Sequence, residues 1–350
     1  MAISSPDTRP PPLPIDKTCT YKTVGETCIP IDLYFPPASN VDAITTDGGQ
    51  AARHPIMLFI HGGGWIGANK SDYSRPLFVE FLTHGFVVAA MDYRLRPETD
   101  LDGQLADVRD VEYWLRESLA LETRAHGVEV DGEKIVVVGC SAGAHLALLT
   151  PQLWTAKPNA IFSMYGPTNL HHLPYLHRFA HLNISNWPCT PEVLAAGTRY
   201  DAPPTEIPIP TPGLPGDDYI LPRSLLAIHL FSRGLIADFL VKGLVRDADG
   251  TLGLPEKGSA SKEEIEAISP LHLAKHLTYP PVYQLLGTAD DVFDTSHAHL
   301  FHAALDAQAI PIATTLVPNV KHAFDSTAPV GGHIHCAYFM PAVEWLAAFV

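Results

Sequence analysis

Short apolar runs alternate along this chain with segments of helical spacing. The runs are rich in β-branched residues and read, in order, CIPIDLYFP, IMLFIH, FVVAAMDYR, KIVVVGC, AIFSMYG, PVYQLLG and ATTLVPNV. After the third run, Leu105, Val108, Val111, Leu115 and Leu119 fall on one face of a predicted helix. Strands that alternate with helices form a mostly parallel sheet covered on both faces. We therefore predict a doubly wound α/β fold.

One region interrupts this alternation. From His171 to Ala267 the chain is rich in Pro, Gly and His and shows no strand pattern. A connection of about a hundred residues is too long for an ordinary loop and indicates a functional insertion. We predict a cap or lid over residues 171–267, a core of residues 21–170 and 268–350, and a flexible lead-in over residues 1–20.

The longest apolar stretch, LLAIHLFSRGLIADFLVKGLV, lies inside this predicted cap. It carries Arg233, Asp238 and Lys242, which a lipid-spanning helix seldom tolerates. We predict an amphipathic helix or pair of helices with no membrane span. Leu226, Leu230, Phe231 and Phe239 would then give it an apolar face that covers a site or packs on the core.

Charge and cysteine content narrow the classes of partner and compartment. The 350 residues carry a formal net charge of −15 with 23 Lys plus Arg, so a nucleic acid or an anionic membrane is not the expected partner. The five cysteines are scattered without CxxC pairs, which indicates free thiols in a reducing compartment. The first 17 residues lack the apolar centre of a secretory signal. We expect a cytoplasmic protein, as a monomer or a homodimer.

A glycine-flanked serine follows one predicted strand directly. Gly139, Cys140, Ser141, Ala142 and Gly143 form a GxSxG motif between the run IVVV and a helical pattern. This context is typical of a nucleophile elbow, in which the serine takes a strained backbone conformation and its neighbours must be small. We predict that Ser141 is a nucleophile. The alternatives are a helix N-cap at Ser141 or a nucleophilic Cys140, although only the central residue of an elbow points outward.

A second glycine cluster, His61-Gly62-Gly63-Gly64, ends the strand IMLFI. An acyl-transfer serine needs rigid N–H donors for the oxyanion of its tetrahedral intermediate, and bare backbone supplies them. We predict that Gly63, Gly64 and Ala142 donate these N–H groups. A phosphate-binding turn is disfavoured because the GxGxxG and GxxxxGK[ST] spacings are absent. Trp65 is expected to pack, with a second possibility that it lines an acyl pocket, and His61 is expected to hold the loop.

The base and its orienting acid are expected later in the chain, in the order Ser, Asp, His. Asp290 lies in the first turn after the strand PVYQLL and is the predicted acid; Asp291 is the second candidate, and Asp294 is the predicted N-cap of the next helix. His322 directly follows the last predicted strand and is the predicted base. The segment GGHIHC lacks a matching second cluster, so no metal is expected.

These motifs together resemble those of the α/β-hydrolase superfamily. IDLYFP, HGGGW, MDYRLRPE, GCSAGAHLA, GTADD and KHAFD stand in the family order from about Tyr21 to the last residue. The sequence is similar to hormone-sensitive-lipase-like esterases and to their kynurenine formamidase and feruloyl-esterase-like relatives. The elbow is closer to the formamidase branch and DYRLRPE to the lipase-like branch, while the long proline-rich insertion departs from compact members of both.

The residues and the resemblance imply a serine hydrolase that needs no cofactor. Ser141 would attack a carboxylic ester or lactone, with His322 as base and Asp290 orienting it. The predicted substrate-binding residues are Trp65, Leu226, Leu230 and Phe231. One alternative is cleavage of an N-formyl or other amide, or acyl transfer, on the same triad. Another is a small-molecule receptor on a hydrolase fold, which would be expected to have an eroded triad.

Overall fold

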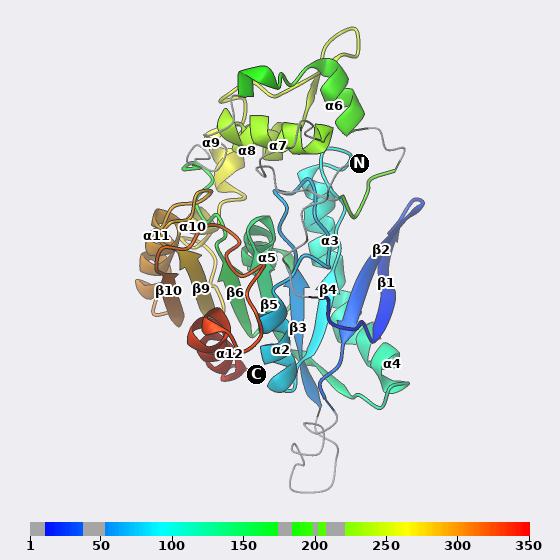
Figure 1. Cartoon of the computed structure of the whole chain (residues 1–350), viewed down its shortest axis with the longest axis vertical. Coiled ribbons are helices and arrows are strands. Elements are labelled where there is room, and N and C mark those ends of the chain that lie inside the picture. Colours follow the sequence, from blue (N-terminus) through cyan, green and yellow to red (C-terminus); the bar gives the residue numbers. More distant parts are fainter. Residues whose placement is uncertain (1–10, 38–52, 174–183, 199–201, 208–220) are drawn as a thin grey trace, which may run out of the picture.

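The computed structural model describes residues 11–37, 53–173, 184–198, 202–207 and 221–350, and every structural statement below concerns these residues. Its centre is an eight-stranded sheet in the order β1-β2-β4-β3-β5-β6-β9-β10 (Figure 1). The strands are β1 Lys17–Val24, β2 Thr27–Tyr34, β3 His54–Ile60, β4 Val87–Met91, β5 Val130–Cys140, β6 Ala160–Met164, β9 Val282–Gly287 and β10 Ile312–Val317. From β4 to β10 all neighbours are parallel, and β1 and β2 add an antiparallel edge. The predicted α/β fold is confirmed.

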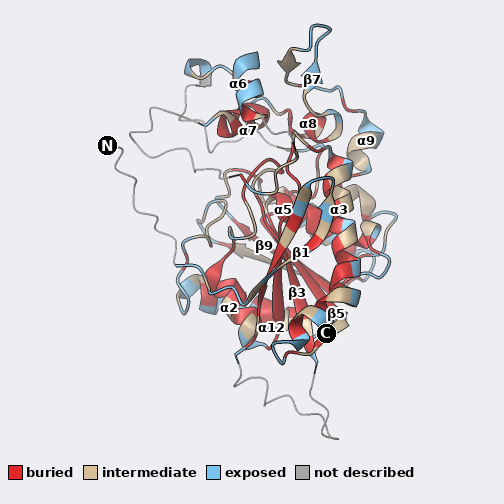
Figure 2. Ribbon diagram, turned by 90° about the vertical axis from the view of Figure 1, so that its right-hand side faces the viewer, coloured by how far each residue is buried: buried red, intermediate tan, exposed pale blue. Residues whose placement is uncertain are grey.

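The central strand β3 shows why the sheet is buried on both faces. Its alternate side chains point to opposite sides, so that Leu58 and Ile60 belong to one apolar cluster and Met57 and Phe59 to another. Helices α3 Leu101–Tyr113 and α5 Ala142–Leu153 cover the first face, and α2 Arg75–Thr83 and α12 Met340–Ala347 cover the second. Figure 2 shows this continuous buried centre.

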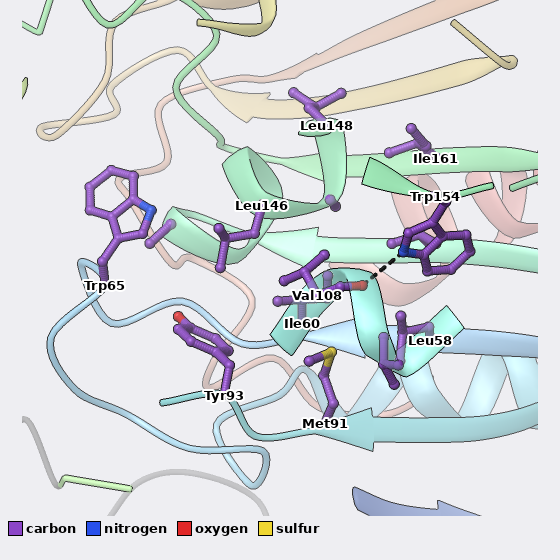
Figure 3. Packing of buried hydrophobic residues seen from close by; sticks show 14 of the residues in the cluster. Leu58, Ile60, Trp65, Met91, Tyr93, Val108, Leu146, Leu148, Trp154 and Ile161 are labelled. Carbon is purple, nitrogen blue, oxygen red and sulfur yellow. Dashed lines mark hydrogen bonds between the residues drawn. The ribbon is translucent and has the colours of Figure 1, made fainter. Parts of the chain in front are cut away.

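A buried tryptophan joins two helices of the first face. Trp154, at the end of α5, donates its indole N–H to the carbonyl oxygen of Val108 on α3 at 2.8 Å (Figure 3). Both residues pack in the cluster that also contains Leu58 and Ile60. The helix that carries Ser141 at its start is therefore fixed at its other end as well.

Further helices complete the core. They are the π-helix η1 Trp114–Ser118, α4 Leu119–Arg124, α10 Pro270–Leu273, α11 Ser296–Asp306 and the π-helix η4 His335–Phe339, which leads into α12. Asp100 caps α3 by accepting a hydrogen bond from the backbone N–H of Gly103.

The described part of the predicted insertion, residues 171–173, 184–198, 202–207 and 221–267, extends beyond one end of the sheet, and its helices lie toward the top of Figure 1. Its described elements are η3 Ile184–Asn186, α6 Pro191–Gly197, α7 Pro222–Ser232, α8 Ile236–Lys242, β7 Val245–Arg246, β8 Leu252–Gly253 and α9 Lys262–Glu266. The expected pair of helices is confirmed as α7 and α8. The antiparallel hairpin β7–β8 was not predicted, because two-residue strands leave no periodic pattern.

No single described helix is long and apolar enough to cross a membrane. Helices α7 and α8 meet that test of length and composition only when taken together, and they bend by 116° at their junction. In this structure Leu226, Leu230, Phe239 and Leu240 of this pair are packed into the main apolar cluster.

The sheet begins earlier than expected. Strand β1 starts at Lys17, inside the segment predicted as a lead-in, and residues 1–10 lie outside the described part. Its sequence, KTCTYKTV, is polar because most of its side chains are not buried. Tyr21 is its anchor and donates its hydroxyl hydrogen to the carbonyl oxygen of Asp92 at 2.9 Å.

Candidate active site

Ser141 lies at the sharp turn between β5 and α5. Its backbone has φ 53° and ψ −121°, a region that residues other than glycine rarely adopt. A Cβ atom at Gly139 would overlap the carbonyl oxygen of Gly143, and one at Gly143 would overlap the carbonyl oxygens of Ile60 and His61. The two glycines therefore let the strand, the helix and the loop after β3 approach at backbone distance, as a nucleophile elbow requires.

Ser141, His322 and Asp290 are brought together from three separate loops. Nε2 of His322 lies 2.9 Å from Oγ of Ser141, and Nδ1 lies 2.9 and 3.1 Å from the two carboxylate oxygens of Asp290. Because the carboxylate accepts, Nδ1 carries the proton and Nε2 accepts from the serine hydroxyl. The side chain of Asp290 is fully buried and that of His322 is 8% exposed.

The neighbouring aspartates have different surroundings. Oδ1 of Asp290 also accepts from the backbone N–H groups of Val292 and Phe293, both at 2.8 Å. Asp291 instead lies 3.5 Å from Nζ of Lys321. Asp294 accepts from the backbone N–H of Ser296 at the start of α11, whose N-cap residue is Thr295, one position later than expected. Of the three, the structure places only Asp290 against the imidazole.

The loop after β3 is held by its carbonyl oxygens. The hydroxyl of Tyr93 donates to the carbonyls of His61 and Gly62 at 3.1 and 3.0 Å. The carbonyl of Trp65 accepts from the backbone N–H of Arg96 and from the side-chain amide of Gln104. These hydrogen bonds fix the backbone of the loop on both sides of Gly63 and Gly64.

The three predicted oxyanion donors have no acceptor within the described residues: neither the N–H groups of Gly63 and Gly64 nor that of Ala142, the first residue of α5, takes part in a hydrogen bond there. Gly63 and Gly64 have φ of 89° and 61°, and a Cβ at Gly63 would overlap the carbonyl of Gly67. Only glycine is unstrained at such angles. The N-terminus of α5 adds the positive end of its dipole to the same place.

Burial keeps two neighbouring groups uncharged. It lowers the pKa of His61 to about 3, and Nδ1 of this histidine donates to the carbonyl of Gly62 at 3.0 Å. Burial also raises the pKa of the Cys140 thiol well above its usual value, so this side chain is not a thiolate. His61 thus braces the loop, and Cys140 is a poor nucleophile.

Trp65 lies in the core, with its side chain fully buried. Its indole N–H donates to Nδ1 of His145 at 3.3 Å, and Nε2 of His145 lies 2.7 Å from the carbonyl oxygen of Ile268. Burial lowers the pKa of His145 to about 4, so the neutral ring accepts at one nitrogen and donates at the other. In this structure Trp65 joins the glycine loop after β3 to helix α5, and its side chain exposes no surface.

The insertion reaches the site through Phe231. A Cβ added at Gly64 would lie 3.3 Å from the Phe231 ring, and that ring is 6.5 Å from the ring of Phe293. The Phe293 ring is in turn 5.5 Å from His322. Leu226 and Leu230 are buried in the main cluster instead. Phe231 is therefore the predicted substrate-binding residue that the structure places at the site.

The residues that pack around the imidazole of His322 were not predicted from the sequence. The ring of Tyr165 lies 4.7 Å from the imidazole, and its hydroxyl donates to the buried carboxylate of Asp325 at 2.8 Å. Phe293 packs against the imidazole from another loop. Each of these residues comes shortly after a core strand or close to a predicted catalytic residue, and that position was the available signal.

The histidine-rich segment near the C-terminus has a structural explanation. Nε2 of His335 lies 2.8 Å from the carboxylate of Glu80, and Nδ1 accepts from the backbone N–H of Gly331. Within the described ranges, no group of three or more His, Cys, Asp and Glu side chains is arranged to hold a metal ion.

Comparisons with known sequences give one family and one recurrent group of relatives. The BD-FAE family model matches residues 42–196. The non-reducing polyketide synthase Preu6 of Preussia isomera is 29% identical over 328 residues, which are 89% of this chain and 14% of that protein. The synthase atr1 of Stereocaulon alpinum is 31% identical over 335 residues, 88% of this chain and 12% of that protein. The chain thus spans roughly an eighth of the length of these relatives.

Solved structures match along almost the whole chain. Thermogutta terrifontis esterase 2 phosphonylated by sarin has a TM-score of 0.57 at 19% identity and covers 95% of this chain and 94% of its own. The propionate-bound form of the same esterase has a TM-score of 0.55 at 22% identity, with 98% and 96% covered. At this identity the likeness establishes the architecture. The chain therefore has the α/β-hydrolase fold, and the expected resemblance to that superfamily is confirmed.

Proposed function

We propose that this protein is a serine hydrolase that cleaves a carboxylic ester or lactone of a small organic molecule. The observation that carries the proposal is the hydrogen-bond chain from Ser141 through His322 to Asp290, set against unpaired N–H groups at the start of α5 and in the glycine loop. The matching solved structures are esterases, and the BD-FAE match supports the same class.

Acylation uses these groups in turn. Oγ of Ser141 attacks the carbonyl carbon while Nε2 of His322 takes its proton, and Asp290 stabilises the imidazolium. The carbonyl oxygen becomes an oxyanion that accepts hydrogen bonds from Gly63, Gly64 and Ala142. His322 then protonates the leaving alcohol, and the acyl group remains on Ser141.

Water completes the turnover. His322 removes a proton from a water molecule, which attacks the acyl carbon and forms a second tetrahedral intermediate in the same oxyanion hole. Collapse of this intermediate returns the proton to Ser141 and releases the acid. The cycle needs no metal or organic cofactor.

A second candidate is acyl transfer on the same triad, in which an alcohol or amine takes the place of water. It is favoured by the similarity of this chain to segments of non-reducing polyketide synthases. The acyl group would then be polyketide-derived. Cleavage of an N-formyl amide would use the same residues of the protein. It differs from ester hydrolysis and from acyl transfer only in the substrate.

Activity profiling tests the proposal. The purified chain is assayed on p-nitrophenyl esters of graded chain length, a lactone panel and N-formyl-kynurenine, with Ser141→Ala as the control. Ester or lactone turnover that is lost in the control supports the hydrolase. Added alcohol or amine that is converted to the acylated product indicates transfer. The absence of turnover on every substrate, together with saturable binding of one of them, would favour a receptor.

A further inference from the structure

A cleft of about 430 Å³ lies where the loop after β4 meets the end of α8. Its walls come from the core at Arg96, Glu98 and Asp100 and from the insertion at Lys242, Gly243 and Arg246. Its volume falls in the range of roughly 300 to 1,000 Å³ that small-molecule sites occupy. No triad residue and no glycine of the oxyanion loop lines it, so it is separate from the catalytic centre.

Arg96 is a buried cation in the wall of this cleft with unused donors. Its side chain is among the largest fully buried ones, and one nitrogen, Nη2, donates to the carbonyl oxygen of Phe239 at 2.6 Å. The guanidinium carbon lies 4.8 Å from the centre of the Phe239 ring. Nε and Nη1 have no hydrogen-bond partner in the described part of the chain, and no salt bridge there includes Arg96. Burial lowers the pKa of Arg96 to about 10, so the group stays charged at neutral pH.

The other charges of the cleft are already engaged. Lys242 pairs with Glu264, and Arg246 donates to the carbonyl oxygen of Gly250. The carboxylate of Asp100 caps α3. These groups do not supply the missing partner of Arg96.

Glu98 adds an unused acceptor. One carboxylate oxygen of Glu98 accepts from Arg223, and the other, Oε2, is buried without a partner among the described residues. Leaving a buried donor or acceptor unpaired is unfavourable, and more so when the group is charged. A ligand that offers both an acceptor and a donor would satisfy the two groups together.

Gly243 lies beside the guanidinium of Arg96 in the cleft wall. It ends α8 with φ 75°, and a Cβ at this position would lie 3.3 Å from Nη2 of Arg96. A side chain here would crowd the guanidinium, and glycine leaves this space in the cleft wall empty.

We propose that this cleft binds a small organic anion whose carboxylate or phosphate group accepts hydrogen bonds from Arg96 and whose hydroxyl donates to Glu98. Guanidinium groups recognise such planar or tetrahedral oxyanions with strong, charge-assisted hydrogen bonds. The anion is either free or the acidic end of the ester itself. The second source rests on the proposed function. The backbone N–H of Arg96 donates to the carbonyl oxygen of Trp65, the residue after Gly64, and so links the cleft wall to the glycine loop.

Calorimetric titration of Ser141→Ala protein tests binding without any turnover. The probes are citrate, which carries carboxylates and a hydroxyl, and inorganic phosphate, with chloride at equal ionic strength as the blank. We expect saturable binding of citrate or phosphate that weakens at least about tenfold in Arg96→Gln, because a hydrogen bond to a charged group is lost. Arg124→Gln removes an exposed arginine of α4 that does not line the cleft, and this variant should bind within about twofold of the parent.

Kinetics on the Ser141 enzyme separate the two sources. If the anion belongs to the substrate, Arg96→Gln lowers kcat/KM for an anionic ester such as p-nitrophenyl hemisuccinate about tenfold relative to p-nitrophenyl butyrate. If the anion is free, this ratio stays unchanged while citrate or phosphate binding is lost. A chain without saturable binding and without a change in the ratio overturns the proposal. If Ser141 enzyme has no esterase activity, the calorimetry still decides it.

Two further measurements test whether a loss of binding in Arg96→Gln comes from misfolding of that variant. Arg96→Lys keeps the positive charge and should retain part of the affinity. In the Ser141→Ala chain, citrate or phosphate should slow hydrogen exchange in residues 239–244. Equal exchange with and without both anions would contradict binding at Arg96.

Discussion

The elbow and the insertion both border the glycine loop after β3, but they are assembled in different ways. At the elbow, backbone packs on backbone: a Cβ at Gly143 would overlap two carbonyl oxygens of the neighbouring loop. At the junction with the insertion, side chains make the contacts: Phe231 covers Gly64, Arg96 binds the carbonyl of Phe239, and Arg223 binds the carbonyl of Arg96.

This difference suggests that the elbow determines the reaction and that the insertion determines which substrate is preferred. Backbone packing leaves almost no room for substitution, so the elbow fixes where Ser141 and the proposed oxyanion donors lie. Side-chain contacts can change one at a time, so the insertion can alter the pocket while the reacting atoms stay in place. Substitutions in the first region should abolish turnover or folding, and those in the second should change preference.

The largest expected effect is at the nucleophile. Ser141→Ala should reduce turnover on the order of a millionfold and leave the fold intact, because the triad acts as a unit. A fluorophosphonate should label the parent chain once at Ser141, as intact-mass analysis and peptide mapping can show. A label on Cys140, or full activity in the variant, would refute the assignment.

The next effect distinguishes two adjacent carboxylates. Asp290→Asn should lower turnover roughly ten-thousandfold, because an amide favours the wrong tautomer of His322. Asp291→Asn is the matched control and should cost little, since Asp291 faces Lys321. Steady-state kinetics on a single ester measure both, and the reverse ranking would move the acid to Asp291.

Alanine substitutions at one glycine of each region compare how the two regions tolerate an added side chain. Gly143→Ala should destabilise the fold by roughly 5 kcal/mol, because its Cβ has no space among backbone atoms. Gly197→Ala, in α6 of the insertion, meets its nearest atom at 3.4 Å and should stabilise by about 0.5 to 1 kcal/mol. Urea unfolding gives both values. Similar stability of the two variants would remove the contrast between the regions.

Acid should weaken the core. Burial lowers the pKa of His61 to about 3 and the pKa values of His145 and His297 to about 4. Below pH 6.5 these histidines are therefore protonated in the unfolded chain and remain neutral in the native chain. Asp92 opposes this, because burial raises its pKa to about 7 and the native chain holds that proton. A net uptake of about 1.5 protons, averaged over this interval, predicts a loss of roughly 3 kcal/mol between pH 6.5 and 5. Urea titrations at the two pH values measure it, and unchanged or higher stability at pH 5 would contradict the burial of these rings as neutral groups.

The smallest expected effect concerns substrate preference. Phe231→Ala should change the ratio of kcat/KM between p-nitrophenyl acetate and a bulky aryl ester about tenfold, with a melting temperature within a few degrees. Tyr113→Ala, on an exposed aromatic of α3, is the control and should change neither. An unchanged ratio with a large loss of stability would mean that Phe231 only holds the insertion on the core.

The strands and the site residues could be predicted because local sequence determines them. A run such as IVVV can be buried only in a sheet, and GxSxG or HGGG describes backbone that must be bare. Strand β1 was not predicted because an edge strand needs few apolar side chains, and its one buried side chain, Tyr21, is held by a distant residue, Asp92. The burial of Leu226 and Leu230, and the contact of Phe231 with Gly64, depend on how the insertion packs, which no periodicity records.

His145 gives this arrangement a further consequence. One turn after Ser141, it holds Trp65 of the glycine loop on one side and the carbonyl of Ile268 on the other. Ile268 is the first residue after the predicted insertion, and this bond ties the returning chain to the helix that begins after Ser141. The contact holds this end of the insertion whatever the length of the insertion is. We therefore expect insertions of other lengths that end at the same contact to leave the position of Ser141 unchanged.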